Sequence, residues 1–500
     1  MKSARGIAAA LLLALVFALA FRFPAESGHG YLEAGAALLL PALLFAFLQG
    51  GLRAGWAFLG LALGLVGIFY WVPGTIAAKA PMSYALALFA GTLFYAWEAL
   101  GFLVVALLGR WAGRRSGPWA AAFTAGLALL LWERYGFHIY TWSWGAALGG
   151  VPWMARSAAF LGSPGLAALL WATGAWAGTC LALGRRPRQV LAGPALGLAL
   201  LALGAGLWPL LPRGPQHVLD VVMIQPDYPA GQRMPGMEED MWRRSDAELR
   251  LVGWPRPEAA TLLLWPESSV LGRDDLLPRP RLALEAQRRG IAWLFGTEGE
   301  DYNLVRGEVA GSPSFIQAKV DPMPFGERMP GPEPMRRWLD RQLGFVSQRR
   351  GTLTPASSLH LPTPQGMLAV HPLLCSEALE SWRVLDGLRV AGADLLTNHT
   401  NDGWFERSPA TDLHAAQIRL RAVETGLPLL RATLTGKSGV FREDGSWDLW
   451  GAPMTEAAYA FTLRWRPVST PYRNPWTSRA ILGLLALGAA ASLLARRRRG

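Results

Sequence analysis

Cysteine and lysine are both scarce in this sequence of 500 residues. The two cysteines are Cys180, inside an apolar run, and Cys375, in a region that reads like a soluble protein. Their placement argues against a disulfide between them, and an unpaired Cys375 is a candidate reactive thiol. Lysine occurs only at positions 2, 79, 319 and 437, against forty-four arginines. A compact ammonium group retained at Lys319 is therefore also a candidate functional group.

Several kinds of binding motif are missing as well. The sequence has no cluster of metal ligands, no phosphate-binding loop and no dinucleotide-binding glycine pattern, so we expect no cofactor. The net charge of +12 would suit a polyanionic partner. However, the arginines stand at the ends of apolar runs rather than in one patch with aromatic residues. We therefore expect no binding to nucleic acid.

Long apolar runs dominate the first two hundred residues. A helix that crosses a hydrocarbon core of roughly 30 Å needs about 20 apolar residues. Runs of this kind cover 6–22, 31–49, 55–74, 83–109, 118–134, 156–183, 190–211 and 478–495. The first resembles a signal peptide, but six more follow it at once, so we interpret it as a retained helix. The sequence predicts a seven-span membrane domain over 1–212, an outer domain over 215–473 and a C-terminal membrane helix over 478–495.

Positive charge alternates along these spans. Every second connection is rich in basic residues, at Lys2 and Arg5, Arg53, Arg110–Arg115, Arg185–Arg188 and Arg496–Arg499. The other connections carry few, at Arg22, Lys79, Arg134 and Arg156. Because cytoplasmic loops carry the excess of Lys and Arg, both termini are predicted inside and the 215–473 domain outside the cytoplasm.

The outer domain alternates between strand-like and helix-like segments. Strands are predicted over 217–224, 261–265, 291–295, 314–320, 366–374, 394–397 and 427–433, with a closing hairpin from 439. Helices are predicted over 238–252, 279–289, 377–391 and 411–424. This alternation is typical of a layered α/β domain. Such domains carry their sites at the carboxyl ends of strands.

Three polar groups lie at or just past the ends of predicted strands: Glu267 in Trp-Pro-Glu-Ser, Lys319 shortly before Pro-Phe-Gly-Glu, and Cys375 before Ser-Glu. A thiol with an ordinary pKa near 8.5 is mostly protonated, and a nearby carboxylate can take its proton. The ammonium group would stabilise the thiolate and the oxyanion of a tetrahedral intermediate. A helix beginning after Cys375 would add its dipole. Together these groups favour acyl transfer through a thioester.

The ordered set of motifs resembles the apolipoprotein N-acyltransferases, a membrane-bound branch of the nitrilase superfamily. The resemblance rests on Trp265–Glu267, Lys319 with Pro324–Glu327, Cys375–Glu377 and Asn401–Phe405. It extends over nearly the whole chain through 69–72, 131–133, 224–226, 421–424 and 426–431. It implies a multi-span helical membrane domain joined to an extracytoplasmic α-β-β-α sandwich.

The resemblance also implies roles for individual residues. Glu267 would be the general base, Lys319 the oxyanion stabiliser and Cys375 the nucleophile. Glu327 would orient the lysine and assist proton transfer. The supporting or substrate-binding positions would be Glu377, Trp404, Tyr302, Asn303 and Asn401. Two departures, Ser376 in place of a common tyrosine and the His371-Pro372 step, affect the expected shape of the acyl pocket.

The implied reaction has two steps. Cys375 would take an acyl chain from a phospholipid, and the α-amine of an S-diacylglyceryl-cysteine at the start of an apolipoprotein would then accept it as an amide. Exclusion of water would favour the amine over hydrolysis. The resemblance places the protein in a bacterial inner membrane, with the catalytic domain in the periplasm, and we expect a monomer.

Alternative functions use the same residues differently. A membrane-anchored nitrilase-type amidase would share the triad but would need no seven-span body. A transporter or receptor would be expected to carry more charged residues within its spans than Glu98 and the Glu133-Arg134 pair. A third alternative is that the catalytic residues are present but inactive. The segment from Arg328 to Gly351 is expected to be a membrane-facing lid or an ordinary surface insertion.

Overall fold

The computed structural model describes residues 2–495 except for short segments. These are 22–27, 80–82, 229–235, 252, 255, 257–258, 272–279, 299–301, 344–346, 352–356, 406–407 and 451. Of the basic residues used to orient the chain, Arg22 and Arg496–Arg499 lie outside the described residues, as do the side chains of Lys2 and Lys79.

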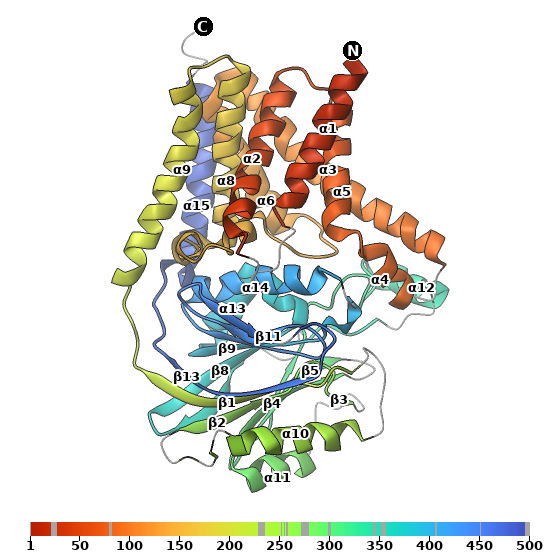
Figure 1. The fold of residues 1–500 in the computed structure, drawn as a ribbon, viewed down its shortest axis with the longest axis vertical. Coiled ribbons are helices and arrows are strands. Elements are labelled where there is room, and N and C mark those ends of the chain that lie inside the picture. Colours follow the sequence, from red (N-terminus) through yellow and green to blue (C-terminus); the bar gives the residue numbers. More distant parts are fainter. Residues whose placement is uncertain are drawn as a thin grey trace.

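Helices make up one half of the molecule (Figure 1). They are α1 (Lys2–Leu19), α2 (Gly30–Gln49), α3 (Ala54–Phe69), α4 (Val72–Lys79), α5 (Tyr84–Ser116), α6 (Pro118–Tyr135), α7 (Pro152–Ala155), α8 (Ala158–Ala182), α9 (Pro187–Leu207) and α15 (Pro475–Leu494), with short 3-10 turns η2 (Trp144–Leu148), η3 (Trp208–Leu210) and η6 (Pro471–Arg473). The start of α1 and the end of α15 both lie at the end of this half that is farthest from the sheets (Figure 1).

Each predicted apolar run is helical, but not every helix is long enough to span a membrane. Among the described residues, five helices are long and apolar enough: α2, α5, α8, α9 with η3, and α15. The pair α3 and α4, bent by 54°, makes a sixth if it is one span, and α1 is shorter. That all eight runs cross a membrane therefore stays a prediction.

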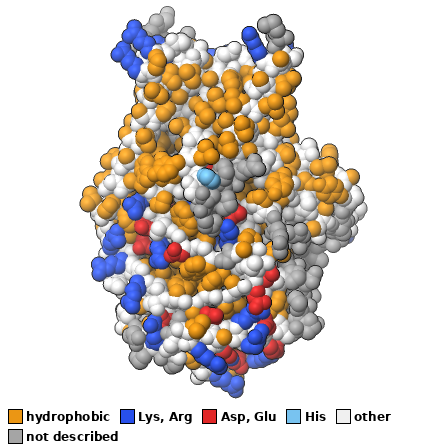
Figure 2. Space-filling model, in the orientation of Figure 1, with side chains coloured by type: hydrophobic (Ala, Val, Ile, Leu, Met, Phe, Trp, Pro, Cys, Tyr) orange, Lys and Arg blue, Asp and Glu red, His pale blue; other side chains and the backbone are white. Residues whose placement is uncertain are grey.

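The surface of the helical half is apolar. Leucine and aromatic side chains of α5 are exposed, among them Phe89, Leu93 and Trp111. Apolar side chains cover most of this half in Figure 2. Asp, Glu and many of the Arg and Lys side chains gather over the half that contains the sheets, and further Arg or Lys side chains lie at the opposite end of the molecule (Figure 2). Helices that expose apolar side chains to their surroundings are stable in lipid rather than in water. The chain is thus a multi-pass membrane protein.

The other half is built on two β-sheets. The first has the order β13-β1-β2-β4-β5-β6, with β3 paired to β4. Its strands are β1 (His217–Gln225), β2 (Ala260–Leu264), β3 (Val270–Leu271), β4 (Ala292–Glu298), β5 (Asn303–Val309), β6 (Phe315–Ala318) and β13 (Ala457–Trp465). The second has the order β12-β11-β10-β9-β8-β7. Its strands are β7 (Leu359–Thr363), β8 (Gly366–Leu374), β9 (Leu395–Thr400), β10 (Leu429–Thr433), β11 (Ser438–Phe441) and β12 (Trp447–Trp450).

The two sheets pack face to face and helices cover their outer faces. Leu219, Leu262 and Leu264 of the first sheet share one buried core with Val370 and Leu430 of the second. On the outer face of the first sheet lie α10 (Met237–Leu251) and α11 (Pro280–Arg289), and on that of the second lie α13 (Ser381–Ala391) and α14 (Ala410–Thr425) (Figure 1). The predicted α-β-β-α sandwich is confirmed.

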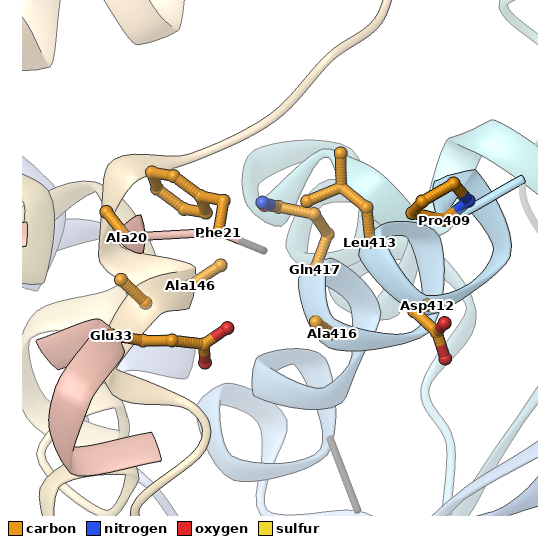
Figure 3. A pocket seen from close by; sticks show the side chains of 10 residues that line it. Ala20, Phe21, Glu33, Ala146, Pro409, Asp412, Leu413, Ala416 and Gln417 are labelled. Atoms are coloured by element: carbon orange, nitrogen blue, oxygen red, sulfur yellow. The ribbon is translucent and has the colours of Figure 1, made fainter. Parts of the chain in front are cut away.

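Helix α14 joins the two halves, because it lies between the second sheet and the membrane helices (Figure 1). The carboxylate of Glu424 accepts from the Ser163 amide at 2.6 Å, and Arg421 donates to the Ser163 hydroxyl at 2.6 Å. Gln417 accepts from the Ser143 amide at 2.9 Å. A crevice of about 20 Å³ at this boundary is lined by Glu33 and Gln417, among others (Figure 3). These bonds fix the sandwich against the membrane half.

Four strands and one helix in the described part of the sandwich half were not predicted from the sequence: β3, β5, β7, β13 and α12 (Glu333–Leu343). The helix predicted over 377–391 is broken, since a 3-10 turn η4 (Cys375–Leu379) precedes α13 and Glu380 between them is extended. Thr411–Glu424, Gly366–Leu374 and the remaining predicted elements are found within a few residues of their expected bounds.

Candidate active site

The polar groups singled out in the sequence come together at one edge of the sandwich. Glu267 follows β2, Lys319 follows β6, Cys375 follows β8, and Asn401 follows β9. Strands β1, β2 and β4 run parallel, as do β8, β9 and β10, so their carboxyl ends meet at this edge. A site at the carboxyl ends of strands is the expected position in such a fold.

Glu267 is 3% exposed and both of its carboxylate oxygens are held. The Asn303 side-chain amide donates to Oε1 at 2.5 Å, and the main-chain N–H of Asn401 donates to Oε2 at 2.8 Å. Gly296 of β4 lies directly behind it, because a Cβ there would stand 2.4 Å from the Glu267 Cα. The carboxylate is therefore positioned by both sheets at once.

Lys319 is 1% exposed and faces two carboxylates. Its Nζ lies 2.8 Å from Oε1 of Glu327 and 3.5 Å from Oε1 of Glu267. Burial opposes the charge, but Glu327 and Glu267 together hold the pKa of Lys319 well above its ordinary value. The site thus contains a fixed ammonium group.

Glu327 is the second partner of the lysine. Its Oε1 also accepts from the Asn303 amide at 3.0 Å, and its Oε2 accepts from the main-chain N–H of Met323 at 2.6 Å. Asn303 therefore bridges the carboxylates of Glu267 and Glu327. The adjoining Tyr302 is 8% exposed.

Cys375 stands at the turn between β8 and η4 with φ of 45°, a left-handed conformation that is uncommon outside glycine. Strain of this kind is often found at functional sites. The Thr400 hydroxyl donates to its Sγ at 3.2 Å, and the Asn398 side chain donates to its carbonyl oxygen at 3.2 Å. Burial, with Glu267 next in effect, raises the pKa of the thiol against the opposing charge of Lys319. The resting thiol is therefore protonated and needs a base.

Glu377 connects the turn at Cys375 to the segment that contains Lys319 and Val320, after β6. Its Oε1 accepts from the Val320 amide at 2.6 Å and its Oε2 from the Leu374 amide at 3.2 Å. Burial raises its pKa to about 7, although Lys319 and the two N–H donors oppose the shift. The expected dipole of a long helix after Cys375 is not available, since η4 has five residues and ends before α13.

A buried network lies behind the cysteine. Arg431 donates to the Asn398 side-chain oxygen at 2.8 Å and to Asp402 at 2.6 Å, and Asp402 also pairs with His414 at 3.0 Å. All four side chains are at most 1% exposed. Arg431 and His414 keep the pKa of Asp402 below its ordinary value despite burial. The network fixes Asn398, which in turn holds the Cys375 carbonyl.

Residues of the membrane half border the site. Trp404 is half-buried in the 3-10 turn η5 (Asp402–Trp404), and it packs against the core shared with the membrane helices. The neighbouring Phe405 ring lies 5.1 Å from that of Trp71 and 6.3 Å from that of Tyr140, measured between centroids. The segment after β9 is thus covered by residues from α3–α4 and from the loop after α6.

Some residues of the site were not singled out in the sequence. Thr400, Asn398 and Gly296 carry no distinctive local motif, because each acts through a neighbour from another strand. The only signal was their place at the ends of predicted strands close to Asn401. Arg431 ends the stretch 426–431 of the resemblance, but no role was assigned to it. Among the described residues, no group of three or more His, Cys, Asp or Glu side chains is arranged to hold a metal ion.

The chain is similar in sequence to known proteins over about 70% of its length. The apolipoprotein N-acyltransferase of Brucella suis is 30% identical over 380 residues, which cover 71% of this chain and 67% of that protein. That of Allorhizobium ampelinum is 30% identical over 377 residues, 69% of this chain and 67% of that protein. That of Sinorhizobium fredii is 28% identical over 420 residues, 73% and 75% of the two chains. No protein-family profile matches the chain.

Solved structures are more distant. A glutamine-dependent NAD+ synthetase from Acinetobacter baumannii has a TM-score of 0.32 and 16% identity, over 49% of this chain and 45% of that one. An N-terminal amidase has a TM-score of 0.24 and 12% identity, over 37% and 48%. The sequence relatives carry the assignment: the chain belongs to the apolipoprotein N-acyltransferase family of enzymes.

Proposed function

We propose that this protein transfers an acyl chain from a phospholipid to the N-terminal amine of S-diacylglyceryl-cysteine in apolipoproteins, through a thioester on Cys375. The observation that carries the proposal is the grouping of polar side chains around one partly buried thiol. Thr400 donates to its Sγ at 3.2 Å, and Lys319 lies 3.5 Å from Glu267 beside it. The charges of Glu267 and Lys319 both act on the thiol.

In the first step, the Cys375 sulfur attacks the ester carbonyl carbon of the phospholipid. The thiol proton moves to the carboxylate of Glu267, and the carbonyl oxygen becomes an oxyanion stabilised by the Lys319 ammonium. The carbon–oxygen bond then breaks. The leaving alkoxide takes the proton from Glu267 and departs as a lysophospholipid, while the acyl chain stays on sulfur as a thioester.

In the second step, the α-amine of the lipoprotein cysteine attacks the thioester carbonyl. Glu267 accepts a proton from the amine, and Lys319 again stabilises the oxyanion. The carbon–sulfur bond breaks, the thiolate of Cys375 recovers the proton, and an amide is released. Cover by the membrane half supports the preference for amine over water, since exclusion of water protects a reactive thioester.

The remaining residues would position these three. Asn303 and Glu327 orient Lys319 and Glu267 through the hydrogen bonds described above. Glu377 holds the segment after β6, which contains Lys319, against the turn at Cys375. Asn401 supports Glu267 through its main chain. Trp404 and Tyr302 would contact the substrates.

The membrane arrangement is part of the proposal. We propose seven spans over 1–212, a catalytic domain over 215–473 and one span over 478–495, in a monomer of the bacterial inner membrane. Arg114 binds Gln49 at 3.2 Å, which places the arginine-rich end of α5 beside the end of α2. Because cytoplasmic loops carry the excess of Lys and Arg, a basic end shared by these helices supports placing both termini in the cytoplasm and the sandwich in the periplasm.

The segment 328–351 would be a lid that faces the membrane. Its helix α12 is amphipathic, with Met335 and Trp338 about half exposed beside Arg337. It lies at the level of the boundary between the two halves (Figure 1). Tryptophan and arginine in such a position suit the interfacial region of a bilayer.

Intact-mass measurement tests the proposal. The purified protein, given phospholipid alone, should gain the mass of one acyl chain, which hydroxylamine should remove. The adduct should be absent in Cys375→Ala and retained in the matched control Cys180→Ala. Adding a diacylated lipopeptide with a free amine should discharge it as an N-acyl product. Absence of the adduct in the wild type would overturn the thioester mechanism, and discharge to free fatty acid alone would favour an amidase-like hydrolase.

A further inference from the structure

A second polar site lies on the side of the membrane half, away from the catalytic residues. A cavity of about 410 Å³ opens where α6, α8 and α15 meet α13. Its membrane-side wall is apolar and includes Leu130, Leu161, Ile481 and Leu482. None of Glu267, Lys319, Glu327 and Cys375 lines it. The volume falls within the range of about 300–1,000 Å³ that is usual for small-molecule sites.

The opposite end of the cavity carries an unsatisfied donor. The guanidinium of Arg134 stacks on the ring of Trp382, with its carbon 4.1 Å from the ring centroid. Its Nη1 is buried and has no hydrogen-bond partner among the described residues. A buried donor without a partner costs about 1–3 kcal/mol, so such groups usually have a bound acceptor.

An unsatisfied acceptor lies at the same end. One carboxylate oxygen of Glu380 accepts from the Thr141 hydroxyl at 3.2 Å. Its other oxygen is buried and has no partner within the described part of the chain. The charge of Arg134 acts on Glu380, and the two side chains line one cavity. A ligand that carries both a negative and a positive group would satisfy both.

The other charged residues of the lining are already occupied or exposed. Arg389 pairs with Asp386 at 2.6 Å, and Glu133 accepts from the Ser143 hydroxyl and the Trp144 amide. Arg479 is exposed at the rim, on the first turns of α15. The positive end is therefore Arg134 with Arg479 beyond it, and the negative end is Glu380.

The surroundings indicate a lipid rather than a soluble zwitterion. Only 6% of the apolar window of α15 is buried within the protein, so the helix beside the cavity is open to the bilayer. A full phospholipid is larger than the cavity, and its acyl chains would leave along α15 past Ile481 and Leu482. Trp382 and Tyr472 at the polar end are residue types common at the level of lipid headgroups.

We propose that this cavity binds the headgroup of a zwitterionic phospholipid, with the phosphate on Arg134, the ammonium on Glu380 and the acyl chains against α15. The site is separate from the thiol and goes beyond the proposed acyl transfer. Its floor, Leu379–Trp382, begins with the last residue of η4, the turn that begins with Cys375. A bound lipid there would brace the segment that carries the nucleophile.

Photo-crosslinking of the full-length protein in detergent micelles tests the site. The probe is a phosphatidylethanolamine with a diazirine close to its glycerol, and labelled peptides are mapped by mass spectrometry. The peptides that contain 379–389 and 475–482 should be labelled. Labelling should fall about tenfold in Arg134→Gln, the loss expected from removing a charge-assisted bond. The matched control is Arg213→Gln, whose guanidinium also stacks on a tryptophan, Trp208, outside the cavity, and it should label like the wild type.

A second variant and four competitors complete the test. Arg479→Gln alters an exposed rim residue that the fold does not need, and it should reduce labelling in the same peptides. Unlabelled phosphatidylethanolamine should compete, whereas diacylglycerol and inorganic phosphate should not. The proposal is overturned if both arginine variants label like the wild type, if diacylglycerol or phosphate alone displaces the probe, or if phosphatidylglycerol competes equally well. The Cys375 adduct, measured in the same samples, reports separately on the acyl-transfer mechanism.

Discussion

Thr400 and Asn401 are consecutive residues, yet one holds the thiol and the other holds the carboxylate. The Thr400 hydroxyl donates to Sγ of Cys375 at 3.2 Å, and the Asn401 main-chain N–H donates to Oε2 of Glu267 at 2.8 Å. Cys375 belongs to the second sheet and Glu267 to the first. The end of β9 therefore sets the position of the base relative to the nucleophile.

Thr400→Val should slow acylation of Cys375 without destabilising the fold. The side chain keeps its shape but loses the donor to sulfur, which should reduce the rate about tenfold, as for a hydrogen bond of about 1.5 kcal/mol. Single-turnover formation of the acyl adduct measures the effect. Thr400→Ser, which retains the hydroxyl, should acylate nearly as fast as the wild type. A wild-type rate in the valine variant would contradict the role of this bond.

Gly296→Ala should displace Glu267. A Cβ at this position would stand 2.4 Å from the Cα of Glu267 and 2.7 Å from the Pro266 oxygen, both main-chain atoms that cannot turn away. We expect loss of acylation and a lower melting temperature, since overpacking costs about 1–3 kcal/mol. Gly35→Ala is the control, because nothing lies within 4 Å of a Cβ there. Equal behaviour of the two variants would refute the close packing behind the base.

Lys319→Met should leave two buried carboxylates facing each other without a cation. Removing one member of a buried ion pair costs about 3–5 kcal/mol, so both stability and acylation should fall. Lys319→Arg should fail to restore acylation. Its guanidinium is wider than the ammonium group that fits between Glu267 and Glu327. Thermal unfolding and adduct formation measure the two effects, and full activity of the arginine variant would show that charge alone suffices.

Glu267→Gln and Lys319→Met should shift the pKa of the Cys375 thiol in opposite directions. After burial, the charge of Glu267 is the largest factor that raises this pKa, and Lys319 opposes it. Glu267→Gln should therefore lower the thiol pKa and speed alkylation by iodoacetamide, while it abolishes acyl transfer for lack of a base. Lys319→Met should raise the pKa. The pH profile of alkylation, recorded in a Cys180→Ala background, checks both, and shifts of the same sign would exclude the proposed electrostatics.

The contribution of His371 to stability should fall as the solution is acidified from pH 6.5 to pH 4. Burial lowers the pKa of His371 from 6.5 to about 4. Within this window the unfolded chain binds a proton that the folded chain does not, so folding loses up to about 3 kcal/mol as the pH falls; above the window the histidine contributes no pH dependence. His371→Gln should flatten the curve of melting temperature against pH between these limits. An unchanged slope would mean that His371 does not titrate on unfolding.

The sequence predicted the sandwich and most of its strands because apolar runs such as Gly366–Leu374 end in turn signals. It missed β13, whose partner β1 lies more than two hundred residues earlier. It also missed β7, a short strand that contains Pro362, although its partner β8 comes next in the chain. Glu267, Lys319, Cys375 and Glu327 were singled out because each follows a strand in a distinctive motif. Thr400 and Asn398 were not, since a hydrogen bond across strands leaves no local pattern.

The chain enters and leaves the sandwich side by side. Arg213 and Val468 form a bridge, the Gly214 N–H donates to the Pro467 oxygen at 2.7 Å, and Ser469 returns a bond to Pro212 at 2.8 Å. β1 and β13 continue this pairing at one edge of the first sheet. A unit whose two ends meet in this way can be inserted into a host chain without altering the host's own connections. The sandwich therefore has the architecture of a domain inserted between two membrane helices, α9 and α15.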